Sequence, residues 1–158
     1  MSRVIVQGED PVAEPSTGDR PRLTYLVKRL EMAERARLEE VLQAHGMTLH
    51  QYTALSLLER RDGLSSAQLA RRHFVTPQAM SQLVSTLERD GLIRREPDAA
   101  HRKILRSRLT DRGRTTLESC HTAVDELERQ MLTGFTPDQE QEFRTALQRS
   151  LQGLAESL

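Results

Sequence analysis

A group of polar, uncharged side chains follows Thr76 at spacings that place them away from the apolar side of one predicted helix. Thr76 is typical of a helix N-cap, and Pro77 of the first helical position, where a missing N–H costs nothing. Glutamine can form paired hydrogen bonds with adenine, and serine can bond to several bases, so this face suits base edges in a major groove. The alternative is an ordinary solvated helix face. The candidate DNA-contacting residues here are Thr76, Gln78, Ala79, Ser81, Gln82 and Ser85.

Basic side chains come next, in a stretch with the period of a β-hairpin. Leucine alternates with arginine over residues 103–110, although Ile104 shares the face of the arginines, and a turn containing Pro97 and Asp98 separates this run from residues 92–95. Arginine and lysine at the tip of such a hairpin can contact phosphates or a narrow minor groove. The alternative is that these charges only protect an exposed sheet edge from aggregation. The candidate contacts are Arg102 and Lys103 near the tip and Arg94 at the base.

The charge of the chain is zero overall but is divided by region. Residues 60–114 hold 13 Arg or Lys and 6 Asp or Glu, a net charge of +7, so the remaining residues carry −7. A basic segment in an otherwise acidic chain is expected where phosphates bind, because each neutralised phosphate releases counterions. A solvated charged face is the alternative interpretation of the same pattern.

Capping signals predict the helices that position these side chains. Thr48 with Gln51, and Ser65 with Gln68, are capping boxes that open two helices, and Ser65 is a further candidate DNA contact. Thr110 is expected to cap a fifth helix, and Thr136 with Pro137 a sixth. Together with an amphipathic pattern after Pro21, the signals predict helices over residues 21–46, 48–61, 65–74, 77–90 and 110–133, and a sixth that starts at residue 136 and carries apolar residues as far as Leu154.

The order of these elements predicts a mainly α protein with a small β-hairpin wing, a winged helix-turn-helix flanked by N- and C-terminal dimerisation helices. The helix over 65–74, a tight turn at residues 73–75 and the helix over 77–90 form the helix-turn-helix, whose second helix enters the major groove. The expected domains are a flexible N-terminal arm (1–20), a dimerisation helix (21–47), a DNA-binding winged helix-turn-helix (48–114) and C-terminal dimerisation helices (115–158).

Several classes of protein do not fit this composition. No apolar run approaches the roughly 20 residues needed to cross a bilayer, and the first residues lack the apolar stretch of a signal peptide, so we expect a cytoplasmic protein with no membrane partner. Cys120 is the only cysteine, which excludes an internal disulfide or a multi-cysteine zinc finger. No glycine-rich phosphate loop or nucleophile–base pair is evident, so we do not expect an enzyme.

The run SSAQLARRHFVTPQAMSQLVSTLERDGLIRREPDAAHRKILRSRLTDRG resembles the MarR (multiple antibiotic resistance regulator) family of winged-helix transcription factors. The resemblance extends over residues 22–156. Its most specific pieces are Leu69-Ala70, the series from Leu83-Val84 to Leu87-Glu88, Asp90-Gly91-Leu92-Ile93, Arg95, Arg102 and Leu109-Thr110 with Gly113. One departure is at the wing tip, where the family commonly has Asp-Arg-Arg and this chain has His101-Arg102-Lys103. The carboxylate that would brace the tip arginine is therefore missing, and Asp98 is the candidate to replace it.

The resemblance implies a homodimer in which the first, fifth and sixth helices of two chains interlock and present two recognition helices to a palindromic operator in double-stranded DNA. It also implies repression that a small aromatic or phenolic effector relieves. The sequence supports the dimer separately, because the terminal helices have long apolar stripes that one small winged domain cannot cover.

Three alternatives remain open at this stage. One is a zinc-responsive regulator of the same fold. Residue types that can bind zinc occur around the first two predicted helices and the fifth: Glu39, Glu40, His45, His50, Cys120 and His121. Their spacing is not that of a metal-binding motif. A redox sensor is another, but Cys120 lies on an apolar stripe, which favours an inert buried thiol. The third is a winged-helix module that binds protein, against which the polar helix face and the basic segment argue.

Overall fold

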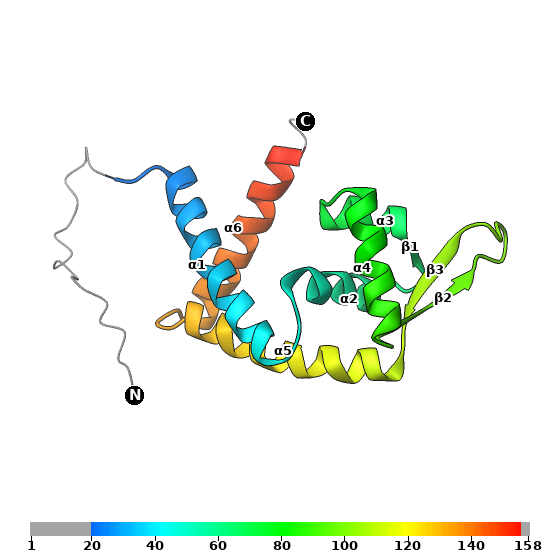
Figure 1. Cartoon of the computed structure of the whole chain (residues 1–158). Helices are drawn as coiled ribbons and strands as arrows, with labels where there is room; N and C mark the ends of the chain where they lie inside the picture. The colour runs from blue at the N-terminus through cyan, green and yellow to red at the C-terminus, as the bar shows by residue number, and fades with distance from the viewer. Residues whose placement is uncertain (1–19, 156–158) are drawn as a thin grey trace. The chain divides into compact units, whose positions relative to one another are not determined.

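The structure, a computed structural model, describes residues 20–155 and is mostly helical, with one small antiparallel sheet (Figure 1). All six predicted helices are present. The flexible arm predicted for residues 1–20 lies, apart from Arg20, outside the described residues. The elements are α1 (Leu23–Ala44), α2 (Leu49–Arg60), β1 (Leu64–Ser65), α3 (Ser66–His73), α4 (Pro77–Arg89), β2 (Ile93–Pro97), β3 (Leu105–Leu109), α5 (Asp111–Met131) and α6 (Pro137–Ala155).

The predicted caps are present at atomic detail. The hydroxyls of Thr48, Ser65, Thr76 and Thr110 each accept a hydrogen bond from a backbone N–H three residues later, and the first two caps are complete capping boxes. Thr136 makes the same reciprocal pair with Gln139 at the start of α6. Each cap satisfies N–H groups that a helix end leaves without a partner, so helix starts could be predicted from local sequence.

The sheet has three strands in the order β1-β3-β2, one more than the predicted hairpin. The additional strand is β1, at the edge of the sheet, where Leu64 pairs with Ser107 of β3 and Ser65 with Arg106. Two residues are too few to show the alternation of apolar and polar side chains by which a strand is predicted from sequence. This strand is defined by its hydrogen bonds to β3, which are a tertiary contact. It ties the start of α3 to the hairpin.

The core of the winged domain lies among α2, α3, α4, the start of α5 and the sheet. The residues on the predicted inner side of α4, Met80, Val84 and Leu87, are fully buried, and Leu83 packs against them at the edge. Other fully buried side chains are Leu55, Leu58, Leu69, Ile93 and Leu117. Burying each such side chain contributes about 1.5–3 kcal/mol, so this cluster holds α4 and the wing on one scaffold.

The alternation along the wing is only partly as predicted. The strand begins at Leu105 rather than Lys103, and the residues before it belong to the turn. Leu109 is buried, but Leu105 is 42% exposed because the hairpin extends past the edge of the core. The apolar side of the wing therefore ends before its tip, and packing alone does not hold the tip.

Candidate DNA-binding interface

The predicted recognition residues of α4 share one exposed face. Gln78, Ala79, Ser81, Gln82 and Ser85 are all exposed, opposite the buried residues of the same helix. Within residues 20–155, none of their side chains has a hydrogen-bond partner. A face of free amide and hydroxyl groups on a rigid helix retains its full hydrogen-bonding capacity for a ligand.

Two further candidates, Ser65 and Thr76, are N-caps. The Thr76 hydroxyl accepts from the Ala79 N–H at 3.2 Å, and the Ser65 hydroxyl accepts from the Gln68 N–H at 3.3 Å. A hydroxyl that accepts one hydrogen bond still has its own proton to donate. Thr76 is exposed beside the free face of α4, whereas Ser65 is half-buried at the start of α3.

The wing tip turns around Asp98. One carboxylate oxygen, Oδ1, accepts hydrogen bonds from the backbone N–H groups of Ala100 and His101, both at 2.9 Å. The other oxygen accepts from Arg106 Nε at 2.6 Å, so Asp98 braces Arg106 and not the tip residue Arg102. The Arg106 guanidinium and these two backbone donors hold the pKa of the Asp98 carboxyl below its usual value.

The side chains of Arg102 and Lys103 are exposed at this tip and make no ion pair with any described residue. Arg94, the third predicted contact, differs, because its Nε donates to Glu96 at 2.7 Å. The neighbouring Arg95 bonds to Glu88 of α4 through two nitrogens, which joins the recognition helix to the base of the wing and lowers the pKa of Glu88. The wing therefore has free cations at its tip and paired ones at its base.

Ion pairing explains where the net charge of the basic segment lies. Every acidic side chain between Arg60 and Arg114 pairs with an arginine of the same segment: Asp62 with Arg108, Glu88 with Arg95, Asp90 with Arg89, Glu96 with Arg94 and Arg108, Asp98 with Arg106, and Asp111 with Arg114. Among the described residues, the basic side chains of the segment without an ion pair are Arg60, Arg61, Arg71, Arg72, Arg102, Lys103 and Arg112. These residues carry the excess of +7 in the segment.

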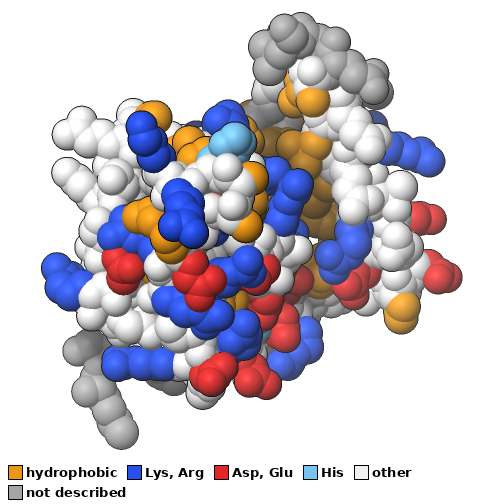
Figure 2. All heavy atoms as spheres, turned by 90° about the vertical axis from the view of Figure 1, so that its right-hand side faces the viewer, with side chains coloured by type: hydrophobic (Ala, Val, Ile, Leu, Met, Phe, Trp, Pro, Cys, Tyr) orange, Lys and Arg blue, Asp and Glu red, His pale blue; other side chains and the backbone are white. Residues whose placement is uncertain are grey.

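The distribution of charge is visible in Figure 2, which faces the side of the molecule where the wing and the helix-turn-helix lie. Basic side chains are numerous there, with acidic side chains interspersed among them, as the ion pairs require. On a face where acidic and basic side chains are mixed, the cations without an ion pair are the ones available to attract a polyanion. The paired arginines stabilise the folded domain instead.

Sequence reasoning missed two features beside the helix-turn-helix. Arg71 and Arg72 lie in the last turn of α3, where positive charge interacts favourably with the C-terminal end of the helix dipole. Phe74, in the turn before α4, is 95% exposed and has a left-handed backbone with φ of 57°. Phe74 occupies a position that glycine favours, so its conformation could not be inferred from the residue type.

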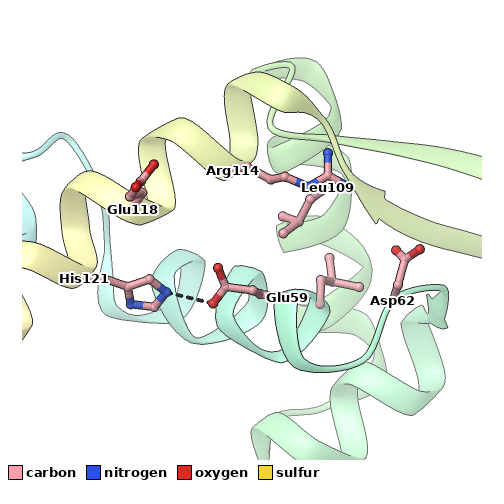
Figure 3. A pocket seen from close by; sticks show the side chains of 7 residues that line it. Glu59, Asp62, Leu109, Arg114, Glu118 and His121 are labelled. Atoms are coloured by element: carbon pink, nitrogen blue, oxygen red, sulfur yellow. Dashed lines mark hydrogen bonds and ion pairs between the residues drawn. The ribbon is translucent and has the colours of Figure 1, made fainter.

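A polar contact joins α2 to α5 on another side of the winged domain. His121 Nε2 lies 2.8 Å from Glu59 Oε2 (Figure 3). On the other side of its ring, His121 Nδ1 lies 3.0 Å from the Tyr52 hydroxyl. A hollow of about 370 Å³, lined by Tyr52, Ser56, His121 and Val124 among others, lies on one side of this contact. Ser56 lines this hollow, but its hydroxyl is buried from solvent.

The zinc-competent residues named from sequence do not converge. His45 Nδ1 lies 3.0 Å from the Ser119 hydroxyl, His50 packs against His73 with ring centroids 5.1 Å apart, and Cys120 is fully buried. Between residues 20 and 155, no group of three or more His, Cys, Asp or Glu side chains lies close enough together to hold a metal ion. No helix of that same stretch is long and apolar enough to cross a membrane.

Comparison with known proteins gives the family. Residues 45–104 match the family model described as MarR family. The chain is 33% identical over 127 residues to the HTH-type transcriptional repressor Rv2887 of Mycobacterium tuberculosis, which spans 80% of this chain and 91% of that protein. The chain belongs to the MarR family. It is thus a member of a family of transcriptional regulators with the winged helix-turn-helix fold.

Solved structures agree with this family fold. The structure of Rv2887 in complex with DNA superimposes with a TM-score of 0.72 at 34% identity, covering 83% of this chain and 98% of that one. Another, of Rv2887 with p-aminosalicylic acid, has a TM-score of 0.68 at 32% identity and covers 82% and 98%. MarR from Escherichia coli is 20% identical with a TM-score of 0.74, covering 84% and 99%, and shares the fold. The mainly α fold with its small wing, predicted from sequence, is confirmed for this MarR-family protein.

Proposed function

We propose that this MarR-family protein is a sequence-specific DNA-binding repressor that acts in the cytoplasm as a homodimer on a palindromic operator. The observation that carries the proposal is the free polar face of α4 beside a wing tip whose cations have no ion-pair partner. Gln78, Gln82 and Ser85 would contact base edges, while Arg102 and Lys103 would contact phosphates or the minor groove. The solved complex of Rv2887 with DNA supports this assignment.

The terminal helices support the dimer. In the single chain α6 has no buried residue, and its Leu151 and Leu154 are 69% and 68% exposed. The described start of α1 likewise exposes Leu23, Tyr25 and Val27. Apolar stripes of this kind are expected to be covered by a second copy of the chain. Residues 48–114 would then form the DNA-binding domain, and residues 21–47 and 115–158 the dimer.

The hollow between α2 and α5 is our candidate effector site. Structures of Rv2887 contain salicylic acid and p-aminosalicylic acid, which are small aromatic carboxylates. The Tyr52 hydroxyl and His121 would bond to the phenol and the Arg60 guanidinium to the carboxylate, while Ser56, Leu57 and Val124 would contact the ring. Glu59, Asp125 and Glu128 also line the hollow. An effector at this point would press on α2 and α5 together and so change the position of the winged domain in the dimer.

Binding to duplexes from the protein's own promoter region tests the proposal. We expect preference for a palindrome over random duplex of equal length at moderate salt, with affinity that falls steeply as salt rises. Equal affinity for both duplexes would contradict sequence-specific regulation. Salicylate is the probe for the effector site: it should release the operator from the wild type, and a Ser56→Val variant that binds operator normally should need more salicylate. If both proteins release the operator at the same salicylate concentration, salicylate does not bind in this hollow.

A further inference from the structure

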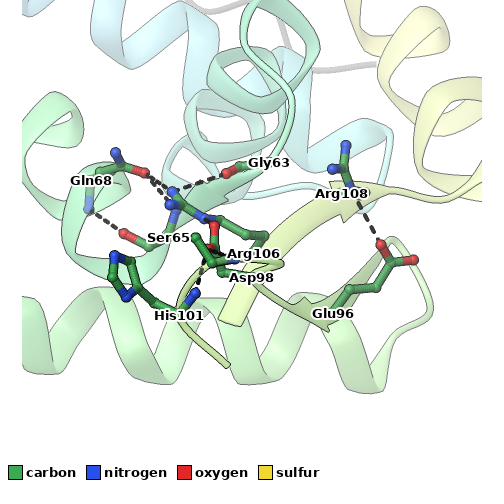
Figure 4. A network of polar contacts seen from close by, with 9 residues as sticks. Gly63, Ser65, Gln68, Glu96, Asp98, His101, Arg106 and Arg108 are labelled. Carbon is green, nitrogen blue, oxygen red and sulfur yellow. Dashed lines mark hydrogen bonds and ion pairs between the residues drawn. The ribbon is translucent and has the colours of Figure 1, made fainter. Parts of the chain in front are cut away.

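Arg106, the second residue of β3, joins three parts of the winged domain (Figure 4). Its Nε donates to Asp98 in the β2–β3 turn at 2.6 Å, and its Nη1 donates to Gln68 Oε1 of α3 at 2.8 Å. The same Nη1 lies 3.4 Å from the Gly63 carbonyl oxygen, just before β1. One planar guanidinium with several fixed donors thus connects the wing to the helix-turn-helix.

The Asp98 end of this network controls the shape of the tip. The Asp98 carboxylate holds the Ala100 and His101 N–H groups, and two backbone bonds of 2.8 Å, from Asp98 N to Ile104 O and from Ile104 N to His101 O, close the turn. Arg102 and Lys103 lie inside that closed turn. Their backbone is therefore fixed by the same carboxylate that bonds to Arg106.

The Gln68 end is equally constrained. Its Oε1 also accepts the Ser65 N–H at 3.0 Å, as the second half of the capping box of α3. Because α3 packs on α4 in the helix-turn-helix, a bond from Arg106 to Gln68 relates the wing to the recognition helix. The Arg106 and Asp98 side chains are only 25% and 17% exposed, and the Nε and Nη1 donors of Arg106 are both used within the protein.

We propose that Arg106, with Asp98 and Gln68, is a positioning residue that sets Arg102 and Lys103 relative to α4 and does not itself bind DNA. This inference rests on the proposed DNA-binding function. The apolar side of the hairpin ends before the tip, where Leu105 is exposed, so this polar network is what orders the tip. Ordering the tip in the free protein removes an entropic cost that binding would otherwise include.

Positioning by Asp98 and attraction by net charge predict opposite effects of Asp98→Asn on operator affinity. Asp98→Asn removes a negative charge from the DNA-facing side, which by electrostatics alone should tighten binding to a polyanion. If Asp98 positions the tip, the amide of Asp98→Asn has one accepting oxygen where the carboxylate has two, so it cannot serve both the backbone N–H groups and Arg106. Operator affinity should then fall about five- to tenfold, the cost expected for one charged contact. Arg106→Lys keeps the charge but not the forked geometry, so it should also weaken binding.

The experiment is a salt titration of operator binding by fluorescence anisotropy. The proteins are the wild type, Asp98→Asn, Arg106→Lys, Arg102→Ala, the double variant Asp98→Asn with Arg102→Ala, and Asp111→Asn. Asp111 is the control because it is an acidic residue of the same segment, paired with Arg114, outside the network. We expect Asp111→Asn to bind as tightly as the wild type or more tightly. Circular dichroism melts of each protein separate loss of the fold from loss of positioning.

Coupling to Arg102 distinguishes positioning from general damage. If Asp98 acts through the tip, Asp98→Asn should weaken the Arg102→Ala protein much less than it weakens the wild type. The slope of log affinity against log salt should become shallower by about 1 in Asp98→Asn and in Arg102→Ala, but not in Asp111→Asn. Unchanged or tighter binding by Asp98→Asn, unchanged binding by Arg106→Lys, or fully additive effects with Arg102→Ala would overturn the inference. Absence of operator preference in the wild type would instead remove the proposed function on which the inference rests.

Discussion

Gly113 lies directly against the backbone of Leu92: a Cβ at Gly113 would be 2.0 Å from the Leu92 carbonyl oxygen. That oxygen accepts the N–H of Thr110, the N-cap of α5, at 3.1 Å. The side chain of Gly113 must therefore be a hydrogen for α5 to begin where the wing ends. This contact joins the winged domain to the helix that we assign to the dimer.

Gly113→Ala should destabilise the protein by about 2–3 kcal/mol in urea denaturation, because backbone atoms, unlike a flexible side chain, cannot move aside. Gly153→Ala in α6 is the control, since a Cβ there meets nothing within 4 Å. The control should be neutral or gain up to about 1 kcal/mol from helix propensity. Equal stability of the two variants would contradict the packing of α5 on Leu92.

Phe74→Gly should stabilise the protein by up to about 1 kcal/mol, because a left-handed backbone costs a residue with a Cβ roughly that much. Little burial is lost, since Phe74 is 95% exposed. Phe74→Ala keeps the Cβ and should leave the thermal midpoint nearly unchanged. A large loss of stability in either variant would mean that the aromatic ring packs in the folded protein.

Base-reading and backbone-contacting residues should separate in binding assays. Gln82→Ala should relax sequence preference by about 1–3 kcal/mol at one base pair, and Arg102→Ala should weaken binding to all duplexes about equally. Arg94→Ala should weaken binding less than Arg102→Ala, because Arg94 is paired with Glu96. A greater effect of Arg94→Ala would mean that this ion pair opens when the protein binds DNA.

Glu88 makes part of the folding stability dependent on pH. The Arg95 guanidinium lowers the pKa of Glu88 below its ordinary 4.5 in the folded state, so the ion pair stabilises the protein above that pH. Its contribution should be lost as pH falls through the lowered folded value. Because Glu88 is 37% exposed, Glu88→Gln should cost no more than about 1 kcal/mol at pH 7, with a smaller further loss on acidification than the wild type shows. Parallel pH profiles would contradict this role.

Cys120 should be inert in the folded protein. It is fully buried, and burial raises the pKa of its thiol above the ordinary 9.0. Iodoacetamide at pH 8 should therefore label the protein in urea but not under native conditions. Rapid labelling of Cys120 in the native protein would instead support the redox-sensor interpretation of the sequence.

Local signals in the sequence predicted most of the fold. The hydroxyl caps at Ser65, Thr76 and Thr110 act over three residues, so the helix starts were right. The same reasoning placed Gln78 and Gln82 on an outer face, which the structure confirms, although their contact with DNA stays a prediction. The start of β3 was misjudged because a period-two pattern does not show where a strand leaves the core.

Only the tertiary structure decided which residues distant in the chain contact one another. From sequence, Arg94 and Arg102 are both candidate DNA contacts of one hairpin, and Asp98 is the candidate to brace the tip arginine. Folding pairs Arg106 with Asp98 and Gln68, pairs Arg94 with Glu96, and leaves Arg102 free. Net charge is a sum over residue types and is determined by the sequence, but which charges remain available depends on distances that exist only once β1, β3 and α3 have come together.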